Sequence, residues 1–319
     1  MKNILKLIVL FSLCFSLIFG ATGCGNNNLI DEDKATVVCT GFAQYDWVLN
    51  ILGSEASNWN VVRLNDKGAD MHSYQPSASD MILLNQADLV IYTGGLSEEW
   101  VSEATKDDGF GGQAYALLEH GQPICIEEDH EEHEGHDHHT HGHDAKEYDE
   151  HIWLSLENAK NFCQDIASLM NDVSPSQKYS ENCKTYTDKL DSLKVRYENV
   201  LEAGEEKTLI FADRFPFRYL AEDYHLHWYA AFPGCSAETE ASFATIKELS
   251  SVVTEHKPSA IFVTETGDDS LAKTVIDNAK FKEVSILEVN SMQSIAAKED
   301  TSYIEIMEDN LALIEAALS

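Results

Sequence analysis

Residues 87–92 of the chain, ADLVIY, are followed by Thr93 and by the glycine pair at 94 and 95. A short apolar run that ends in turn residues is typical of a buried β-strand. Upstream, the hydrophobic pattern predicts strands at 35–40 and 59–64 and helices at 46–52 and 77–85. An alternation of strands and helices predicts a sheet whose strands are largely parallel.

The second half of the chain repeats this alternation. It predicts strands at 208–211, 228–232, 259–263 and 285–289 and helices at 217–223, 245–253 and 270–279. Between the two halves, residues 156–203 have a nearly continuous helical pattern that is interrupted at 174–176, Ser-Pro-Ser. We therefore predict an α/β protein with two lobes, each with a largely parallel sheet, joined by a long rigid helical connector.

The N-terminus has the features of a bacterial lipoprotein signal peptide. Two lysines within the first six residues precede an apolar segment at 7–20, and the small residues at 21–23 lead to Cys24. The apolar stretch is short for a transmembrane helix, which needs about 20 residues. We expect cleavage before Cys24, a lipid on that cysteine, and a protein held at the extracytoplasmic face of the cell membrane. The predicted organisation is a signal peptide (1–23), a lipidated tether (24–34), an N-terminal α/β lobe (35–155), a helical connector (156–204) and a C-terminal α/β lobe (205–319).

The histidine-rich segment, residues 127–144, reads EEDHEEHEGHDHHTHGHD, with seven histidines, eight carboxylates and no apolar residue. Such a run has nothing to bury, so we expect a disordered loop in the N-terminal lobe. Imidazoles and carboxylates are preferred ligands of zinc, with copper and nickel as competitors. The alternative is a solvated acidic loop. The predicted auxiliary metal ligands are His130, His133, His136, His138, His139, His141 and His143.

The charge of the chain excludes one class of partner and favours another. The formal net charge is −33, from 22 Lys and Arg against 55 Asp and Glu. Nucleic acids are bound by clustered Lys and Arg, so we expect no nucleic-acid partner. The negative electrostatic field of the chain favours a cation instead. Enzyme motifs are also missing, because the histidines of HEEH at 130–133 are three apart and no G-x-S-x-G, P-loop or Rossmann fingerprint is present. We expect a binding protein, not an enzyme.

Five cysteines remain besides Cys24 once the predicted signal peptide is removed, so at least one thiol stays unpaired. If residues 157–172 and 176–203 form antiparallel helices around the Ser-Pro-Ser turn, Cys163 and Cys183 lie about equally far from that turn. We favour a disulfide between these two. The other three are Cys39, Cys125 and Cys235.

Four segments carry a family resemblance: DKGADMHSYQPSASD (66–80), IYTGG (91–95), EHIWLSLENAK (150–160) and SYIEIMEDNLALIEAAL (302–318). They resemble the metal-binding lipoproteins of ABC importers, the zinc and manganese solute-binding family, from about residue 36 to the end. The resemblance implies two α/β lobes bridged by a long helix, an ion held in the interlobe cleft, and a monomer that works with the permease and ATPase subunits of an importer. Zinc is the expected cargo because the histidine-rich segment and the Irving–Williams order both favour it over manganese, the alternative. A metal-buffering or adhesin surface lipoprotein is a further alternative.

Two ligands follow from this resemblance directly. His72 in MHSYQP matches the family's first histidine ligand, and His151 in EHIWLSL matches its second. Asp70 and Glu150 lie close by in sequence, and a carboxylate there can accept the other imidazole N–H.

The third and fourth ligands are less well defined. The family presents histidine or glutamate where ungapped matching places Arg214, which stays protonated and binds no cation. We predict Asp213 as the third ligand, with Arg214 turned toward a nearby carboxylate; the alternative is that Asp213 caps the following helix. Glu240 is the first choice for the fourth ligand. The other candidates are Glu238, Glu265, Asn290, Cys235 and water.

Four further histidines are not expected to bind metal: His120, His225, His227 and His256. His225 and His227 alternate in the strand-like stretch YHLHW, which predicts that they share one face of a strand.

Overall fold

The computed structural model describes residues 30–126, 147–203, 207–232, 234 and 241–318. Residues Lys34–Ser319 belong to one compact unit, and the description below concerns that unit. Several predictions fall outside the described residues: the signal peptide, Cys24, the histidine-rich segment, Cys235, Glu238 and Glu240. Within the described ranges, no helix is long and apolar enough to cross a membrane.

The N-terminal lobe is built on a four-stranded sheet in which every pair of neighbours is parallel, in the order β2-β1-β3-β4. The central strands β1 and β3 are buried because helices cover both faces, which explains their continuous apolar sequence. The strands are β1 (Ala35–Cys39), β2 (Trp59–Arg63), β3 (Leu89–Tyr92) and β4 (Gln113–Ala116). The helices are α2 (Phe42–Leu52), α3 (Ala78–Asn85), α4 (Glu99–Lys106) and α5 (Leu117–His120).

The C-terminal lobe repeats this plan with a second parallel sheet in the order β6-β5-β7-β8. The strands are β5 (Thr208–Arg214), β6 (His227–Phe232), β7 (Ala260–Thr264) and β8 (Ser285–Val289). The helices are α8 (Arg218–Asp223), α9 (Phe243–His256), α10 (Asp269–Asn278) and α11 (Tyr303–Leu318). The predicted fold class, two lobes with parallel sheets, is therefore confirmed.

Two local predictions in the C-terminal lobe were wrong. Strand β5 continues past the predicted end at Phe211 to Arg214, with a shift of register against β6 between these residues. Beyond the shift, the last two residues of the strand, Asp213 and Arg214, are polar and only partly buried. His225 does not share a strand face with His227, because it lies in the turn before β6 with φ +55°.

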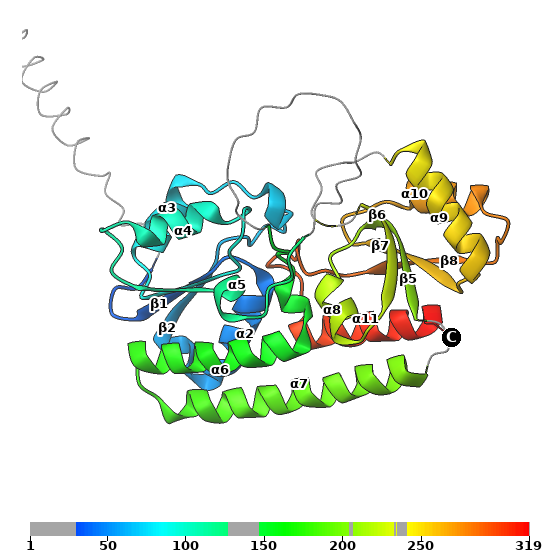
Figure 1. Ribbon diagram of the computed structural model, residues 1–319. Helices are drawn as coiled ribbons and strands as arrows, with labels where there is room; N and C mark the ends of the chain where they lie inside the picture. Colours follow the sequence, from blue (N-terminus) through cyan, green and yellow to red (C-terminus); the bar gives the residue numbers. More distant parts are fainter. Residues whose placement is uncertain (1–29, 127–146, 204–206, 233, 235–240, 319) are drawn as a thin grey trace, which may run out of the picture. The chain divides into compact units, whose positions relative to one another are not determined.

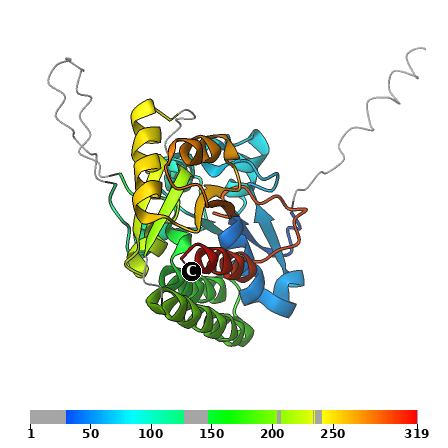
Figure 2. The ribbon, with the colours of Figure 1, turned by 90° about the vertical axis from the view of Figure 1, so that its right-hand side faces the viewer.

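Helices cover the second sheet on both sides. On one side, α9 and α10 pack on it (Figures 1 and 2) through a separate apolar cluster that includes Leu249, Val253 and Val275. On the other side, α8 and α11 join a larger core that continues without interruption into the N-terminal lobe. The two sheets therefore share one hydrophobic core.

The connector consists of two antiparallel helices, α6 (Leu156–Val173) and α7 (Gln177–Ala203), on either side of the predicted turn. Helix α7 extends along both lobes (Figure 1). Near its start, the Tyr179 hydroxyl accepts a hydrogen bond from Trp59 Nε1 in β2 (2.9 Å). Farther along, the Tyr197 hydroxyl donates to the Met307 carbonyl in α11 (2.7 Å). The helix is thus attached to both lobes.

Cys163 and Cys183 do lie close together on these helices, but both are free thiols, so the predicted disulfide is not formed. The Cys183 thiol instead donates to the Cys163 carbonyl oxygen (3.3 Å). Cys39 and Cys125 are free as well.

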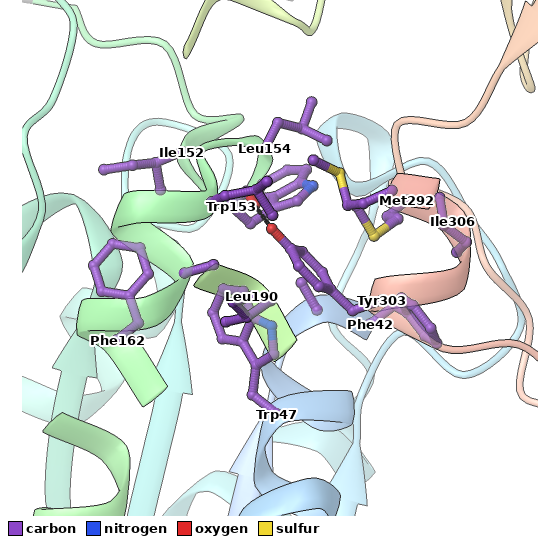
Figure 3. Close-up of a cluster of buried hydrophobic side chains, with 14 of the residues drawn as sticks. Phe42, Trp47, Ile152, Trp153, Leu154, Phe162, Leu190, Met292, Tyr303 and Ile306 are labelled. Carbon is purple, nitrogen blue, oxygen red and sulfur yellow. Dashed lines mark hydrogen bonds between the residues drawn. The ribbon is translucent and has the colours of Figure 1, made fainter. Parts of the chain in front are cut away.

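A group of aromatic side chains joins the lobes beside the loop that carries His151 (Figure 3). Trp153 is the centre of this group. Its indole Nε1 donates to the Ser291 carbonyl (2.9 Å), and its own carbonyl accepts from the Tyr303 hydroxyl (2.6 Å). Both partners belong to the C-terminal lobe, so the position of this loop is fixed from across the lobe boundary.

Candidate metal centre

His72 lies beyond the carboxyl end of β2, in the short 3-10 turn Met71–Ser73. Asp70 begins this turn, and its Oδ1 accepts the backbone N–H of His72 (2.9 Å). The ring is held through Nδ1, which lies 2.9 Å from Ser97 Oγ and 3.2 Å from Glu150 Oε2. In parallel sheets the loops after the strands form ligand sites, and this turn is in such a position.

His151 is buried at the start of the turn Ile152–Leu154. The Asp149 carboxylate holds it twice, since Oδ1 accepts the backbone N–H of His151 (2.9 Å) and lies 2.8 Å from the ring Nδ1. Asp149 is fully buried, and its carbonyl accepts a hydrogen bond from the Tyr219 hydroxyl (2.7 Å). The second ring is therefore as firmly oriented as the first.

The two rings face each other with their Nε2 atoms 3.3 Å apart. A carboxylate only accepts hydrogen bonds, so Glu150 and Asp149 favour the tautomers with the proton on Nδ1, which puts the metal-binding lone pairs on Nε2. A tetrahedral zinc ion with Zn–N bonds of about 2.0–2.1 Å requires two ligand nitrogens about 3.3–3.4 Å apart. The observed separation is the one that two zinc ligands need.

Glu150 links the two histidine-bearing loops. Its Oε1 accepts the backbone N–H of Ser97 (2.9 Å), while Oε2 faces His72. Gly95 has φ +80°, and a Cβ at this position would lie 2.3 Å from Glu150 Oε1. A side chain at position 95 would therefore displace the carboxylate that orients His72.

The three carboxylates around the histidines carry negative charge into the site. Burial raises the pKa of each, but their partners outweigh it, and the pKa of Asp70, Asp149 and Glu150 lies below the usual value. The partners are Arg214 and the N–H of His72 for Asp70, His151 and Arg218 for Asp149, and His72 and Ser97 for Glu150. Ionised carboxylates beside two imidazoles favour a bound cation.

Asp213 is held inside the C-terminal lobe. Its Oδ2 accepts from both the backbone N–H (2.9 Å) and the hydroxyl (2.7 Å) of Thr264, and its Oδ1 accepts the backbone N–H of Arg214 (2.8 Å). It does not cap α8, whose N-cap residue is Phe217. In the described part of the chain, no three His, Cys, Asp or Glu side chains form a group that could hold a metal. The structure therefore does not bring Asp213 together with the two histidines in such a group, and its role as third ligand stays a prediction.

Arg214 is turned toward a carboxylate, as predicted, and that carboxylate is Asp70, 2.8 Å from its Nη2. Of the other candidates, Glu265 accepts from the backbone N–H (2.8 Å) and hydroxyl (2.7 Å) of Ser291. Asn290 Oδ1 accepts from the backbone N–H of Met292 (2.8 Å). Both side chains hold the loop after β8. Glu240, Glu238 and Cys235 lie outside the described residues.

Sequence reasoning missed Asp149, Ser97 and Arg218, which contact the two histidines or the carboxylates that hold them. Asp149 precedes His151 by two residues, as Asp70 precedes His72, and this repeated D-x-H spacing could have predicted that each aspartate holds its histidine. Ser97 and Arg218 are distant in sequence and gave none. Two histidines that were not expected to bind metal contact tyrosines that are not part of the candidate site: His120 is exposed and stacks on Tyr115 (ring centroids 4.2 Å apart), and His256 lies near Tyr229 (5.8 Å).

Two α/β lobes with parallel sheets share one core, and this architecture defines a two-lobed α/β protein in which His72 and His151 form a candidate metal site. The chain belongs to the family described as zinc-uptake complex component A, periplasmic (ZnuA), whose model matches residues 37–317. The resemblance found in the sequence is thereby confirmed.

Three relatives show the range of the family. The zinc-binding lipoprotein AdcA of Streptococcus pneumoniae (strain ATCC BAA-255 / R6) is 28% identical over 97% of this chain and 60% of its own length. The high-affinity zinc uptake system protein ZnuA of Bacillus subtilis (strain 168) is 28% identical over 98% and 97%. The manganese ABC transporter substrate-binding lipoprotein PsaA of Streptococcus anginosus is 29% identical over 100% of both chains. This chain thus spans about 60% of the length of the pneumococcal AdcA proteins.

Solved structures agree with the fold. The Zn(II)-bound ZnuA-like domain of Streptococcus pneumoniae AdcA has a TM-score of 0.69 at 25% identity and covers 89% of this chain and 99% of that one. The laminin-binding protein Lmb of Streptococcus agalactiae has a TM-score of 0.73 at 20% identity, covering 89% and 100%. At that identity the second likeness concerns the fold alone.

Proposed function

We propose that this protein binds zinc outside the cytoplasm and delivers it to an ABC-type importer, without catalysing a reaction. The observation that carries the proposal is the 3.3 Å separation of the Nε2 atoms of His72 and His151, each ring oriented by a buried carboxylate. Two ligands leave a tetrahedral ion incomplete, so Asp213 and Glu240 are proposed to complete its coordination. The names of the AdcA and ZnuA relatives support zinc as the cargo.

The proposal also covers the location of the protein, its partners and its division into lobes. The names of relatives that are lipoproteins support a lipid on Cys24, which would hold the protein at the outer face of the cell membrane. We propose that it acts there as a monomer. Its partners would be the permease and ATPase subunits of the importer. The histidine-rich segment, from His130 to His143, would collect ions weakly and release them to the tighter site. The lobes are proposed to divide at 35–155 and 205–319, with residues 156–204 as connector.

Metal analysis and calorimetry of untagged protein test the central claim. We expect one tight zinc per chain, which remains when residues 127–144 are deleted and disappears in His72→Ala and in His151→Ala. A double histidine variant that still binds one zinc tightly would refute the site. Growth of a gene-deleted strain in chelated medium separates an importer component from a metal-buffering lipoprotein, because only the former is needed for uptake.

Manganese is the second candidate, since the relative PsaA is named a manganese transporter protein and aligns over its full length. Affinity at nitrogen and oxygen ligands follows the Irving–Williams order, in which zinc exceeds manganese. Competition between the two ions for the purified protein decides the matter. Displacement of zinc by equimolar manganese would favour the manganese function.

A further inference from the structure

Arg214 at the end of β5 and Arg218 at the start of α8 both reach carboxylates of the N-terminal lobe. Arg214 Nη2 lies 2.8 Å from Asp70 Oδ2, and Arg218 Nε lies 3.4 Å from Asp149 Oδ2. Asp70 accepts the backbone N–H of His72, and Asp149 accepts the backbone N–H of His151 and lies beside its ring Nδ1.

Each carboxylate divides its oxygens between a histidine and an arginine. Asp70 uses Oδ1 for the backbone N–H of His72 and Oδ2 for Arg214. Asp149 uses Oδ1 for the backbone and ring of His151, and its Oδ2 faces Arg218. The two relays, Arg214–Asp70–His72 and Arg218–Asp149–His151, have the same order of residues. They differ in that Asp70 acts on the backbone of His72, whose ring is held by Glu150 and Ser97, whereas Asp149 also contacts the ring of His151.

Both arginines are themselves fixed by the C-terminal lobe. Arg214 Nη2 also donates to Thr266 Oγ1 (2.9 Å), in the loop after β7. The Arg218 guanidinium lies over the Trp228 ring, 5.0 Å from its centroid, on β6. Neither side chain is more than about a quarter exposed, so solvent screens these ion pairs less than it would at the surface.

We propose that Arg214 and Arg218 are positioning residues through which the C-terminal lobe sets the geometry of His72 and His151. This inference rests on the proposed zinc site. Ungapped matching places Arg214 where the family presents a metal ligand, and from this position it contacts Asp70, which holds the backbone of His72. Loss of a partner behind a metal-binding histidine typically lowers metal affinity 10- to 100-fold.

The charges of the arginines also affect zinc affinity, and this effect has the opposite sign to the positioning effect. A guanidinium near the site repels a divalent cation, so removing its charge without any change of geometry strengthens zinc binding. Removing a positioning contact weakens it. The direction of the change therefore distinguishes the two roles.

The experiment measures zinc affinity by chelator competition, at one salt concentration, for the wild type, Arg214→Gln, Arg218→Gln and Arg218→Lys. The control is Arg196→Gln, which removes the same charge from an exposed ion pair with Glu308 between α7 and α11. We expect affinity 10- to 100-fold lower in both glutamine variants, partial recovery in Arg218→Lys, and no change in the control. The absorption bands of bound cobalt, which report ligand geometry, should shift in the glutamine variants only.

The outcomes separate the two claims. Wild-type affinity or tighter binding in Arg214→Gln, with unchanged cobalt bands, overturns the inference while the zinc site stands. A wild type that binds no tight zinc overturns the proposed function and the inference with it. If Arg218→Gln fails to fold, Arg214→Gln still decides, and a double variant Asp70→Asn/Arg214→Gln no weaker than the single one supports a shared relay.

Discussion

At the residue scale, the site depends on how closely Glu150 approaches the backbone of another loop. Glu150 fits only because position 95 is glycine, whose φ of +80° and missing Cβ leave space for the carboxylate. The carboxylate in turn sets the orientation of His72. A glycine outside the histidine-bearing loops thus determines the orientation of His72, a proposed zinc ligand.

Replacement of Gly95 by alanine should lower zinc affinity at least about tenfold, because the new methyl group displaces Glu150 from His72. Chelator competition measures this change. Gly111→Ala is the matched control, since a Cβ there meets nothing within 4 Å. Equal losses in both variants would show a general effect of the substitution and contradict this account.

At the element scale, helices α2 and α7 are joined by a buried acid. The Tyr186 hydroxyl on α7 donates to Asp46 Oδ2 on α2 (3.0 Å). Burial raises the pKa of Asp46 to about 6, although the Tyr186 hydrogen bond opposes the shift. Between about pH 4 and pH 6 the folded protein therefore holds a proton that the unfolded chain has released.

The stability that this proton contributes is present at low pH and is lost as the pH rises through about 6. Relative to Asp46→Asn, the wild type should lose about 2 kcal/mol of unfolding free energy between pH 4.5 and pH 7, because one pKa unit corresponds to about 1.4 kcal/mol and most of the shift from 3.8 to about 6 lies in this range. Urea denaturation at several pH values, with chelator present, measures the difference. A difference that stays flat or grows with pH would contradict the assignment.

The elements that sequence reasoning found are those whose burial imposes a pattern. Strands β1, β3 and β7 are buried along nearly their whole length and read as apolar runs. The missed strand β4 has only four residues, of which the first two are exposed, and α4 has only eight residues, of which Val101 alone is buried, so each is a short segment with few buried residues. In the site, the two histidines were predictable by resemblance. The turn of Arg214 toward a carboxylate was also predicted, but its partner Asp70 and the pair of Arg218 with Asp149 were not, because only the folded chain brings these residues together.

At the scale of the whole molecule, zinc should stabilise both lobes together because they share one core. A ligand that binds only the folded state adds about 2.7 kcal/mol to the unfolding free energy at a concentration 100 times its Kd. We expect calorimetry to show a single transition that moves to higher temperature with zinc. The transition of His72→Ala should stay in place, apart from weak effects of the histidine-rich segment. Two separate transitions, of which zinc shifts one, would contradict a shared core.

If the protein delivers zinc to an importer, as proposed, the attachment of α7 to both lobes affects how the importer distinguishes the empty protein from the zinc-loaded one. A helix bonded to Trp59 at one end and to Met307 toward the other resists wide separation of the lobes, so the empty and loaded forms present nearly the same face to a receptor. An importer that recognises only the shape of the protein then also binds the empty form, which competes with the zinc-loaded form. Excess His72→Ala protein should accordingly inhibit zinc uptake by the reconstituted importer, and the inhibition should yield to more loaded wild type.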